Sequence, residues 1–276
     1  MARLLILTLH SGEAGLPVQV RQLASQSFQD FEHQVISGLP NQAAHNRVYR
    51  TIRDRAGEFD LFLKLDADMT LRSDTALADV ITATDRHPDI QHFAFRVWDC
   101  FTEDETLGVH LFRSGVNWGE VTDDLFVDPD PPAVRRLMWE GAPAPFINHG
   151  EVVSDFECFS FGVHKFLKVA QRGRNTPVVE KPHKFLRHMR NCAKIRDLYK
   201  ATGARRHRLA LAGVMWAMQH REVAAFTDKA ALARAFERDV EGREDVWRSH
   251  VDRLSRSLIR WRLSLLRALG PRRAFA

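Results

Sequence analysis

Short apolar runs alternate with helix-like segments over the first hundred residues, and no other feature constrains the fold as strongly. The runs at 3–9, 31–37, 59–65 and 91–98 are short and nearly continuous, which predicts buried strands. Helical patterns fill the intervals at 17–27, 42–56 and 74–84. Strands that alternate with helices in this way are typical of an α/β layer fold with a mainly parallel sheet.

The remainder of the chain has a different character. Residues 107–113 predict one more strand, 114–145 form a loop-rich insertion, and the pattern is helical from about residue 183. Charge divides at a similar place: residues 1–171 hold 15 Lys and Arg against 25 Asp and Glu, whereas 172–276 hold 25 against 10. We therefore expect two regions, an acidic α/β domain (1–171) and a basic helical appendage (172–276).

Composition narrows the class of protein. The chain has 276 residues, of which 45% are hydrophobic and 27% charged, as in an ordinary globular protein. No apolar run approaches the roughly 20 residues that span a bilayer, and Leu4–Leu9 is too short for a secretory signal. The three cysteines are odd in number and form no C-x-x-C pair, so we expect free thiols in a reducing compartment. The predicted localisation is cytoplasmic.

Two carboxylates follow the most apolar strand. Asp66 and Asp68 stand two apart where the 59–65 run ends, and ligands of open α/β sheets bind at the carboxyl ends of the strands. Mg²⁺ or Mn²⁺ is typically held by one or two such carboxylates together with phosphate oxygens. The pair therefore indicates a metal that activates a diphosphate leaving group, although a strand-end turn with Asp68 as a helix cap remains open.

Residues 41–71 extend this motif. The segment from Asn41 through His45-Asn46-Arg47 to Asp66-Ala67-Asp68 resembles the central part of family-2-like glycosyltransferases, in which a helix with an Arg-Asn-like pair precedes the strand that delivers a D-x-D motif. The resemblance covers about residues 3–115, is partial from 146 to 170 and fades beyond. It implies a GT-A fold and transfer of a sugar from a nucleotide diphosphate-sugar to an acceptor hydroxyl, as in bacterial glycan or polysaccharide synthesis.

The resemblance also implies roles for particular residues. Thr8, His10 and Glu13 would lie near the base and ribose of the nucleotide. Asn46 and Lys64 would lie near the base or the sugar, and Asp66 and Asp68 would hold the metal and ribose. The chain departs from the family at Ser37–Pro40, where an acidic, Ser-rich turn usually contacts the base. The identity of the base stays open.

Two histidines are further candidates at the diphosphate. His149 follows an apolar run and precedes Gly150, a strand-end position like that of Asp68, so we expect it to bind the metal or the diphosphate. His164 and Lys165 are expected to contact the diphosphate, because cationic groups stabilise departing phosphates. A satisfied polar role remains the alternative for each.

An inverting transferase needs a carboxylate that accepts the proton of the acceptor hydroxyl. The usual Glu-Asp pair of the family has no clear match in this chain. Asp155 is the first candidate and Asp99 the second, and a capping or solvent-facing role stays open for both.

The C-terminal end predicts an amphipathic helix. Leu258, Trp261, Leu265 and Leu269 recur at spacings of three and four, with arginines mostly elsewhere on the helix. Such a helix is typical either of a peripheral anchor on the inner face of a membrane or of an ordinary helix packed on the catalytic domain. No nucleic-acid-binding signature accompanies the charge, so nucleic acid is not expected as a partner. A membrane anchor would suit a glycan or lipid-linked acceptor.

Other functions remain open. Asp66-Ala67-Asp68-Met69-Thr70 also matches the D-x-D-x-T motif of haloacid-dehalogenase-type phosphatases, but that family places the motif on its first strand with Gly before the Thr. A GT-A domain that serves as a non-catalytic scaffold at a membrane surface is the other alternative. The sequence favours the metal-dependent glycosyltransferase.

Overall fold

A computed structural model describes residues 2–128, 135–138, 146–170, 182–220, 226–241 and 243. The chain packs as two compact units. The first consists of residues 1–122 and 127–154, and the second of residues 123–126 and 155–276. Each unit is described by itself below.

The first unit contains the strands and three helices of the α/β pattern. In chain order they are β1 (Leu4–His10), α1 (Leu16–Ala24), β2 (Phe31–Ser37), α2 (Asn41–Asp54), β3 (Leu61–Asp66), β4 (Met69–Leu71), α3 (Ala76–Asp85), β5 (His92–Asp99), β6 (Asp104–Arg113), β7 (Arg136–Met138) and β8 (Ile147–His149). The strands and helices expected in the first hundred residues are confirmed to within a few residues at their ends.

The sheet is mixed rather than mainly parallel. Its order is β2-β1-β3-β6-β5-β8-β4, with β7 also pairing β5. β1 pairs β2 and β3 in parallel, and β5 pairs β7 and β8 in parallel. In contrast, β6 is antiparallel to β3 and β5, and β4 is antiparallel to β8. The expectation fails at β6, because only the turn 100–103 separates it from β5 and so short a connection returns the chain as a hairpin.

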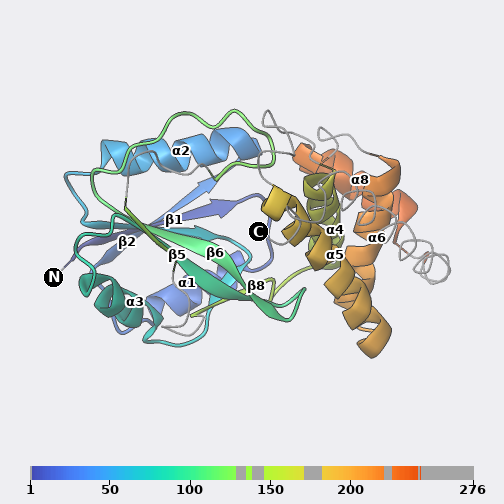
Figure 1. The fold of residues 1–276 in the computed structure, drawn as a ribbon, viewed down its shortest axis with the longest axis horizontal. Coiled ribbons are helices and arrows are strands. Elements are labelled where there is room, and N and C mark those ends of the chain that lie inside the picture. The colour runs from blue at the N-terminus through green and yellow to red at the C-terminus, as the bar shows by residue number, and fades with distance from the viewer. Residues whose placement is uncertain are drawn as a thin grey trace. The chain divides into compact units, whose positions relative to one another are not determined.

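Helices cover both faces of this sheet (Figure 1). On one face, Leu23 of α1 and Val80 of α3 pack with Leu63 and Phe95 in a buried cluster. On the other face, Val48 and Ile52 of α2 pack with strand residues such as Leu7 and Phe62. The apolar face of each helix therefore fixes it on the sheet, and the carboxyl ends of β1, β3 and β5 remain available for polar residues.

The second unit is helical. It contains α4 (Asp155–Val169), α5 (Pro182–Thr202), α6 (Arg205–Gln219) and α8 (Lys229–Asp239). Two glycines bring α4 and α6 into close contact: a Cβ at Gly162 would lie 1.8 Å from the carbonyl oxygen of Ala210, and one at Gly213 would lie 2.0 Å from that of Phe159. The Phe159 ring packs on Trp216 beside these glycines. α4 therefore belongs to the helical unit, so this division precedes the expected boundary after residue 171.

Two further expectations concern the whole chain. Cys100, Cys158 and Cys192 are free, as expected. Within the described part of the chain, no helix combines the length and apolar character needed to cross a membrane. The expected amphipathic helix at 255–269 lies outside the described residues.

Candidate functional site

The strand-end carboxylates occupy a tight turn. Asp66 is the last residue of β3, and Ala67 and Asp68 form the turn that leads into β4. The backbone N–H of Ala67 donates to the carbonyl oxygen of Leu9 at 2.9 Å, which ties the turn to β1. The side chains of Asp66 and Asp68 are 40% and 27% exposed, although the Oδ1 atom of each is buried. Part of each carboxylate therefore remains accessible to a ligand.

A buried glutamine in α1 holds this turn. The Gln19 amide nitrogen donates to the carbonyl oxygens of Asp66 and Met69, at 2.9 and 2.8 Å. Its amide oxygen accepts from the Thr8 hydroxyl at 2.9 Å. Gln19 and Thr8 are both 0% exposed. Each polar atom of the Gln19 side chain therefore has a partner, and the turn is fixed from two sides.

Gly15 lets α1 approach the same turn closely. A Cβ at this position would lie 2.7 Å from the carbonyl oxygen of Ala67 and 3.4 Å from Cα of Asp68. Any side chain would therefore displace the segment that carries the two carboxylates.

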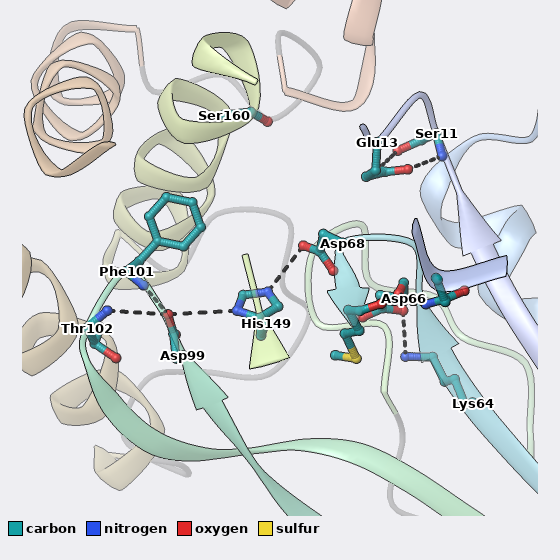
Figure 2. A network of polar contacts seen from close by, with 12 residues as sticks. Ser11, Glu13, Lys64, Asp66, Asp68, Asp99, Phe101, Thr102, His149 and Ser160 are labelled. Carbon is teal, nitrogen blue, oxygen red and sulfur yellow. Dashed lines mark hydrogen bonds and ion pairs between the residues drawn. The ribbon is translucent and has the colours of Figure 1, made fainter. Parts of the chain in front are cut away.

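His149 lies between two carboxylates at this edge of the sheet (Figure 2). Its Nε2 is 3.2 Å from Asp68 Oδ2, and its Nδ1 is 3.8 Å from Asp99 Oδ1. Strand pairing explains the arrangement, because His149 is in register with Asp99 of β5 on one side and Met69 of β4 on the other. The Gly150 N–H also donates to the Asp68 carbonyl oxygen at 2.9 Å.

These carboxylates determine the charge of the imidazole. Burial alone would lower the pKa of His149, but the neighbouring Asp68 and Asp99 raise that pKa well above the ordinary value. The two carboxylates therefore favour the protonated form of His149, which pairs with Asp68.

Asp99 supports its neighbours rather than facing solvent. It is 1% exposed, and its Oδ1 accepts from the backbone N–H groups of Phe101 and Thr102 at 2.8 and 3.3 Å. The carboxylate thus closes the β5–β6 turn and lies beside His149. This environment suits a residue that orients the imidazole better than one that accepts a proton from an acceptor hydroxyl.

Lys64 forms a second charged cluster with Asp66 and Asp128. Its Nζ lies 3.4 Å from Asp66 Oδ1 and 3.0 Å from Asp128 Oδ1. Burial opposes the charge of Lys64, but Asp128 and Asp66 outweigh burial and raise its pKa. The ammonium therefore stays charged although its side chain is only 3% exposed.

Other residues expected to contact the nucleotide are placed differently. The Asn46 side-chain amide bonds to the backbone of Val121. Its Nδ2 donates to the Val121 carbonyl oxygen at 3.2 Å, and its Oδ1 accepts from the Val121 N–H at 2.8 Å. His10 ends β1 and is half-buried. Glu13 is half-buried and accepts from the N–H and hydroxyl of Ser11, as Figure 2 also shows. His10 and Glu13 thus lie at and just beyond the carboxyl end of β1, whereas Asn46 anchors a loop.

Three predicted site residues belong to the second unit. Asp155 forms an ion pair with Arg205, whose hydrogen bonds lower the pKa of the carboxyl group. The His164 ring stacks on Phe226 at 5.0 Å, and burial followed by nearby lysines lowers its pKa well below the ordinary value. Lys165 Nζ lies over the Phe161 ring at 4.5 Å. The roles proposed for these residues stay predictions.

The donor atoms at the sheet edge fit one kind of metal site. Within the described ranges, no three His, Cys, Asp or Glu side chains gather into a metal-binding group. Asp68 Oδ2 and His149 Nε2 do meet at 3.2 Å. Mg²⁺ and Mn²⁺ accept a small number of protein ligands when substrate phosphates and water complete the set. The residues therefore fit an ion that is shared with a phosphate ligand.

Three contributors to the site were missed from sequence. The sequence predicts Gln19 on the surface of an amphipathic helix, because glutamine is usually exposed. A signal did exist: Gln19, Gln22 and Gln26 are spaced by three and four residues, and Gln22 and Gln26 likewise accept from the backbone N–H of Leu71 and Leu77. Gly15 and Asp128 act through contacts with distant parts of the chain, for which the local sequence holds no signal.

Comparison with known proteins adds little to this description. No family model matches the chain, and no curated protein matches its sequence. One similar solved structure is A197 from STIV, with 12% identity and a TM-score of 0.32 over 40% of this chain and 64% of that one. Another is a glycosyltransferase involved in the glycosylation of the major capsid of PBCV-1, with 16% identity and a TM-score of 0.37 over 55% of this chain and 94% of that one. Similarities this distant assign no role to any residue.

Proposed function

We propose that the chain is a metal-dependent glycosyltransferase that moves a sugar from a nucleotide diphosphate-sugar to an acceptor hydroxyl. One observation carries the proposal: Asp66 and Asp68 lie at the carboxyl end of β3 with His149 Nε2 3.2 Å from Asp68. The resemblance of residues 41–71 to family-2-like glycosyltransferases supports the same function. A GT-A arrangement of the first unit is part of this proposal.

The proposed donor site uses groups that the fold fixes in place. Asp68 and His149 would hold Mn²⁺ or Mg²⁺, with Asp66 beside them, and the ion would neutralise the diphosphate that departs. Gln19 and Gly15 keep the turn of the two carboxylates in position before any ligand binds. Such preorganisation lowers the cost of stabilising charge on the leaving group. His10 and Glu13 remain proposed contacts of the nucleoside, and His164 and Lys165 of the diphosphate. Thr8 is 0% exposed and its hydroxyl bonds to Gln19, so it supports the turn instead.

In the proposed transfer, the acceptor oxygen forms a bond to the anomeric carbon as the bond to the diphosphate oxygen breaks. The hydroxyl proton passes to a carboxylate. Asp155 remains the proposed base, but its ion pair with Arg205 lowers its pKa and makes it a weaker proton acceptor than an unpaired carboxylate. Asp99 was the second candidate, and its burial at 1% exposure favours a positioning role instead.

A thermal-shift panel tests the donor site. UDP, GDP, CDP and TDP are each added with and without Mn²⁺ to the wild type and to Asp66→Ala/Asp68→Ala. A ligand at 100 times its Kd adds about 2.7 kcal/mol, which raises Tm by several degrees in a protein of this size. Asp85→Ala, which removes an exposed carboxylate at the end of α3, is the matched control.

The outcomes separate the possible functions. A Mn²⁺-dependent shift for one nucleotide, absent in the double variant and present in Asp85→Ala, would support the donor site and name its base. No shift with any nucleotide would contradict the proposal. Release of phosphate from a phosphomonoester would then favour the phosphatase alternative. If the chain neither binds a nucleotide nor releases phosphate, the scaffold is favoured.

The acceptor and the cellular setting are also proposals. A glycan or a lipid-linked glycan in polysaccharide synthesis would supply the acceptor hydroxyl. The basic segment 255–269 would place the enzyme on the inner face of a membrane, where anionic head groups attract arginine.

A further inference from the structure

Two buried donors converge on a single oxygen of Asp128. Lys64 Nζ lies 3.0 Å from Asp128 Oδ1. The Tyr49 hydroxyl donates to the same oxygen at 3.3 Å and shares its proton with the Val127 carbonyl oxygen at 3.4 Å. The His45 ring lines the same place, with its Nε2 3.8 Å from that oxygen. Lys64 comes from β3, while His45 and Tyr49 stand one turn apart on α2. The sheet and the helix thus bring the side chains of Lys64, Tyr49 and His45 together at one anionic oxygen, and these three side chains are called the pocket below.

The pocket and its occupant differ in exposure. The side chains of Lys64 and His45 are 3% and 9% exposed, whereas that of Asp128 is 44% exposed. The donors therefore belong to the packed interior of the unit, and the carboxylate reaches them from the surface. An exposed carboxylate of this kind can be replaced by another anion without unpacking the core.

The segment that carries Asp128 is anchored upstream of it. Val121 is bound by Asn46 and Gln42 of α2, and the Trp118 ring packs on Tyr49 at 5.0 Å between centroids. These contacts hold the segment on α2 independently of the Asp128 side chain. Asp128 can therefore leave the pocket while the segment stays in place.

The charge of Lys64 does not by itself require Asp128 as a second carboxylate. Asp66 already lies 3.4 Å from Lys64 Nζ and supplies one opposite charge. A second carboxylate, with an additional hydroxyl donor directed at it, exceeds what one buried ammonium needs. The arrangement is instead typical of a site that binds an anion through a cation and a neutral donor.

We propose that Lys64 and Tyr49, lined by His45, form a phosphate-binding pocket that the chain's own Asp128 fills when no ligand is bound. A phosphate oxygen of the diphosphate takes the position of Asp128 Oδ1, and Asp128 turns out to solvent. This inference rests on the proposed function, which supplies the diphosphate. Asp128 thereby competes with the ligand and lowers its apparent affinity.

Pyrophosphate binding without divalent metal tests the competition, measured by isothermal titration calorimetry in the presence of EDTA. We expect Asp128→Asn to bind pyrophosphate at least tenfold more tightly than the wild type. Glu120→Gln is the matched control, because Glu120 lies on the same segment, pairs only with the exposed Arg50 among the contacts described, and its loss changes the net charge equally. Adding Tyr49→Phe to Asp128→Asn should remove part of the gain.

The proposal is overturned if natively folded Asp128→Asn binds pyrophosphate no more tightly than Glu120→Gln, or if neither binds it. Should Asp128→Asn fail to fold, amide NMR of the wild type decides. Pyrophosphate must then shift the Lys64 and Asp128 signals together and leave Glu120 unchanged, and a shift at Lys64 alone would contradict displacement. Because no sugar is transferred in these measurements, a gain of binding without nucleotide-sugar turnover would contradict only the proposed function.

Discussion

Gln19 donates a hydrogen bond of 2.9 Å from its side-chain amide to the backbone carbonyl oxygen of Asp66, the first carboxylate of the strand-end pair. The same amide nitrogen reaches Met69 on the other side of the turn, at 2.8 Å. The position of both carboxylates therefore depends on a neutral residue in α1 that touches neither carboxylate group. A change at this one side chain should therefore affect both stability and the proposed ligand binding.

Replacing Gln19 with leucine should destabilise the first unit and weaken the site together. The substitution removes the amide donor from the carbonyl oxygens of Asp66 and Met69, whereas the Thr8 hydroxyl keeps its contact with His33 Nε2 at 2.9 Å. Each buried group that loses its partner costs about 1–3 kcal/mol. We expect a loss of roughly 2–4 kcal/mol in the free energy of unfolding by urea, together with weaker Mn²⁺-dependent nucleotide binding. Gln34→Leu on the edge strand β2 is the control, and equal effects of the two variants would refute the role of Gln19.

Gly15→Ala should shift the turn of Asp66 and Asp68. The new Cβ would meet the Ala67 carbonyl oxygen at 2.7 Å, so the backbone must move, at a cost of about 1–3 kcal/mol. Gly57→Ala is the matched control, because a Cβ at Gly57 has no other atom within 4 Å. Tm and nucleotide affinity should fall for Gly15→Ala only. If both variants keep the wild-type affinity, close approach at Gly15 does not position the carboxylates.

Asp99→Asn should weaken metal binding while the fold is retained. The asparagine oxygen can still accept from Phe101 and Thr102, but the charge beside His149 Nδ1 is lost. Removing such a supporting group typically costs about 10–100-fold in metal affinity, which Mn²⁺ titration by electron paramagnetic resonance measures. The pKa of His149, followed by ¹⁵N NMR, should fall as well.

A double variant separates this effect from general damage. Once His149→Ala has removed the imidazole, adding Asp99→Asn should cause no further loss of Mn²⁺ affinity. Additive losses would show that Asp99 acts on the metal site by another route.

Local patterns predicted the elements well, and the pairing of strands poorly. The boundaries of β1 and β2 follow from apolar runs that are visible in the sequence. The insertion of β6 between β3 and β5 does not follow, because it depends on the pairing of β6 with β3, a strand far back along the chain. The sequence does hold one signal: the expected strands 91–98 and 107–113 are separated only by residues 99–106, too short a connection for a crossover helix, which favours an antiparallel pair.

The candidate site shows the same division. Asp68 and His149 were each recognised by their position at the end of an apolar run, and the structure places them 3.2 Å apart. Asn46 was expected to meet a nucleotide, yet its amide binds the backbone of Val121, 75 residues further along the chain. Asp128 meets Lys64 across a similar separation. Such partners depend on how a loop packs, which one sequence does not encode locally.

Acid should destabilise the first unit through His110. Burial, the largest effect, lowers the pKa of its imidazole from 6.5 to about 4, and its ring nitrogen contacts that of His92 at 2.9 Å. Between these two pKa values the unfolded state binds more protons than the folded state, so the free energy of unfolding decreases as the pH falls. The contribution of His110 is therefore complete above about pH 6.5, is lost progressively down to about pH 4 and is constant below.

Urea unfolding at a series of pH values measures this effect. At about 1.4 kcal/mol per pKa unit, His110 should account for up to about 3 kcal/mol of the decrease. His164 titrates in the same direction in the second unit, so the comparison must be with His110→Gln, which keeps a polar partner for His92 and does not take up a proton. We expect the curve of His110→Gln to be flatter than that of the wild type between pH 6.5 and 4. Parallel curves would mean that folded His110 takes up its proton as readily as the unfolded chain does.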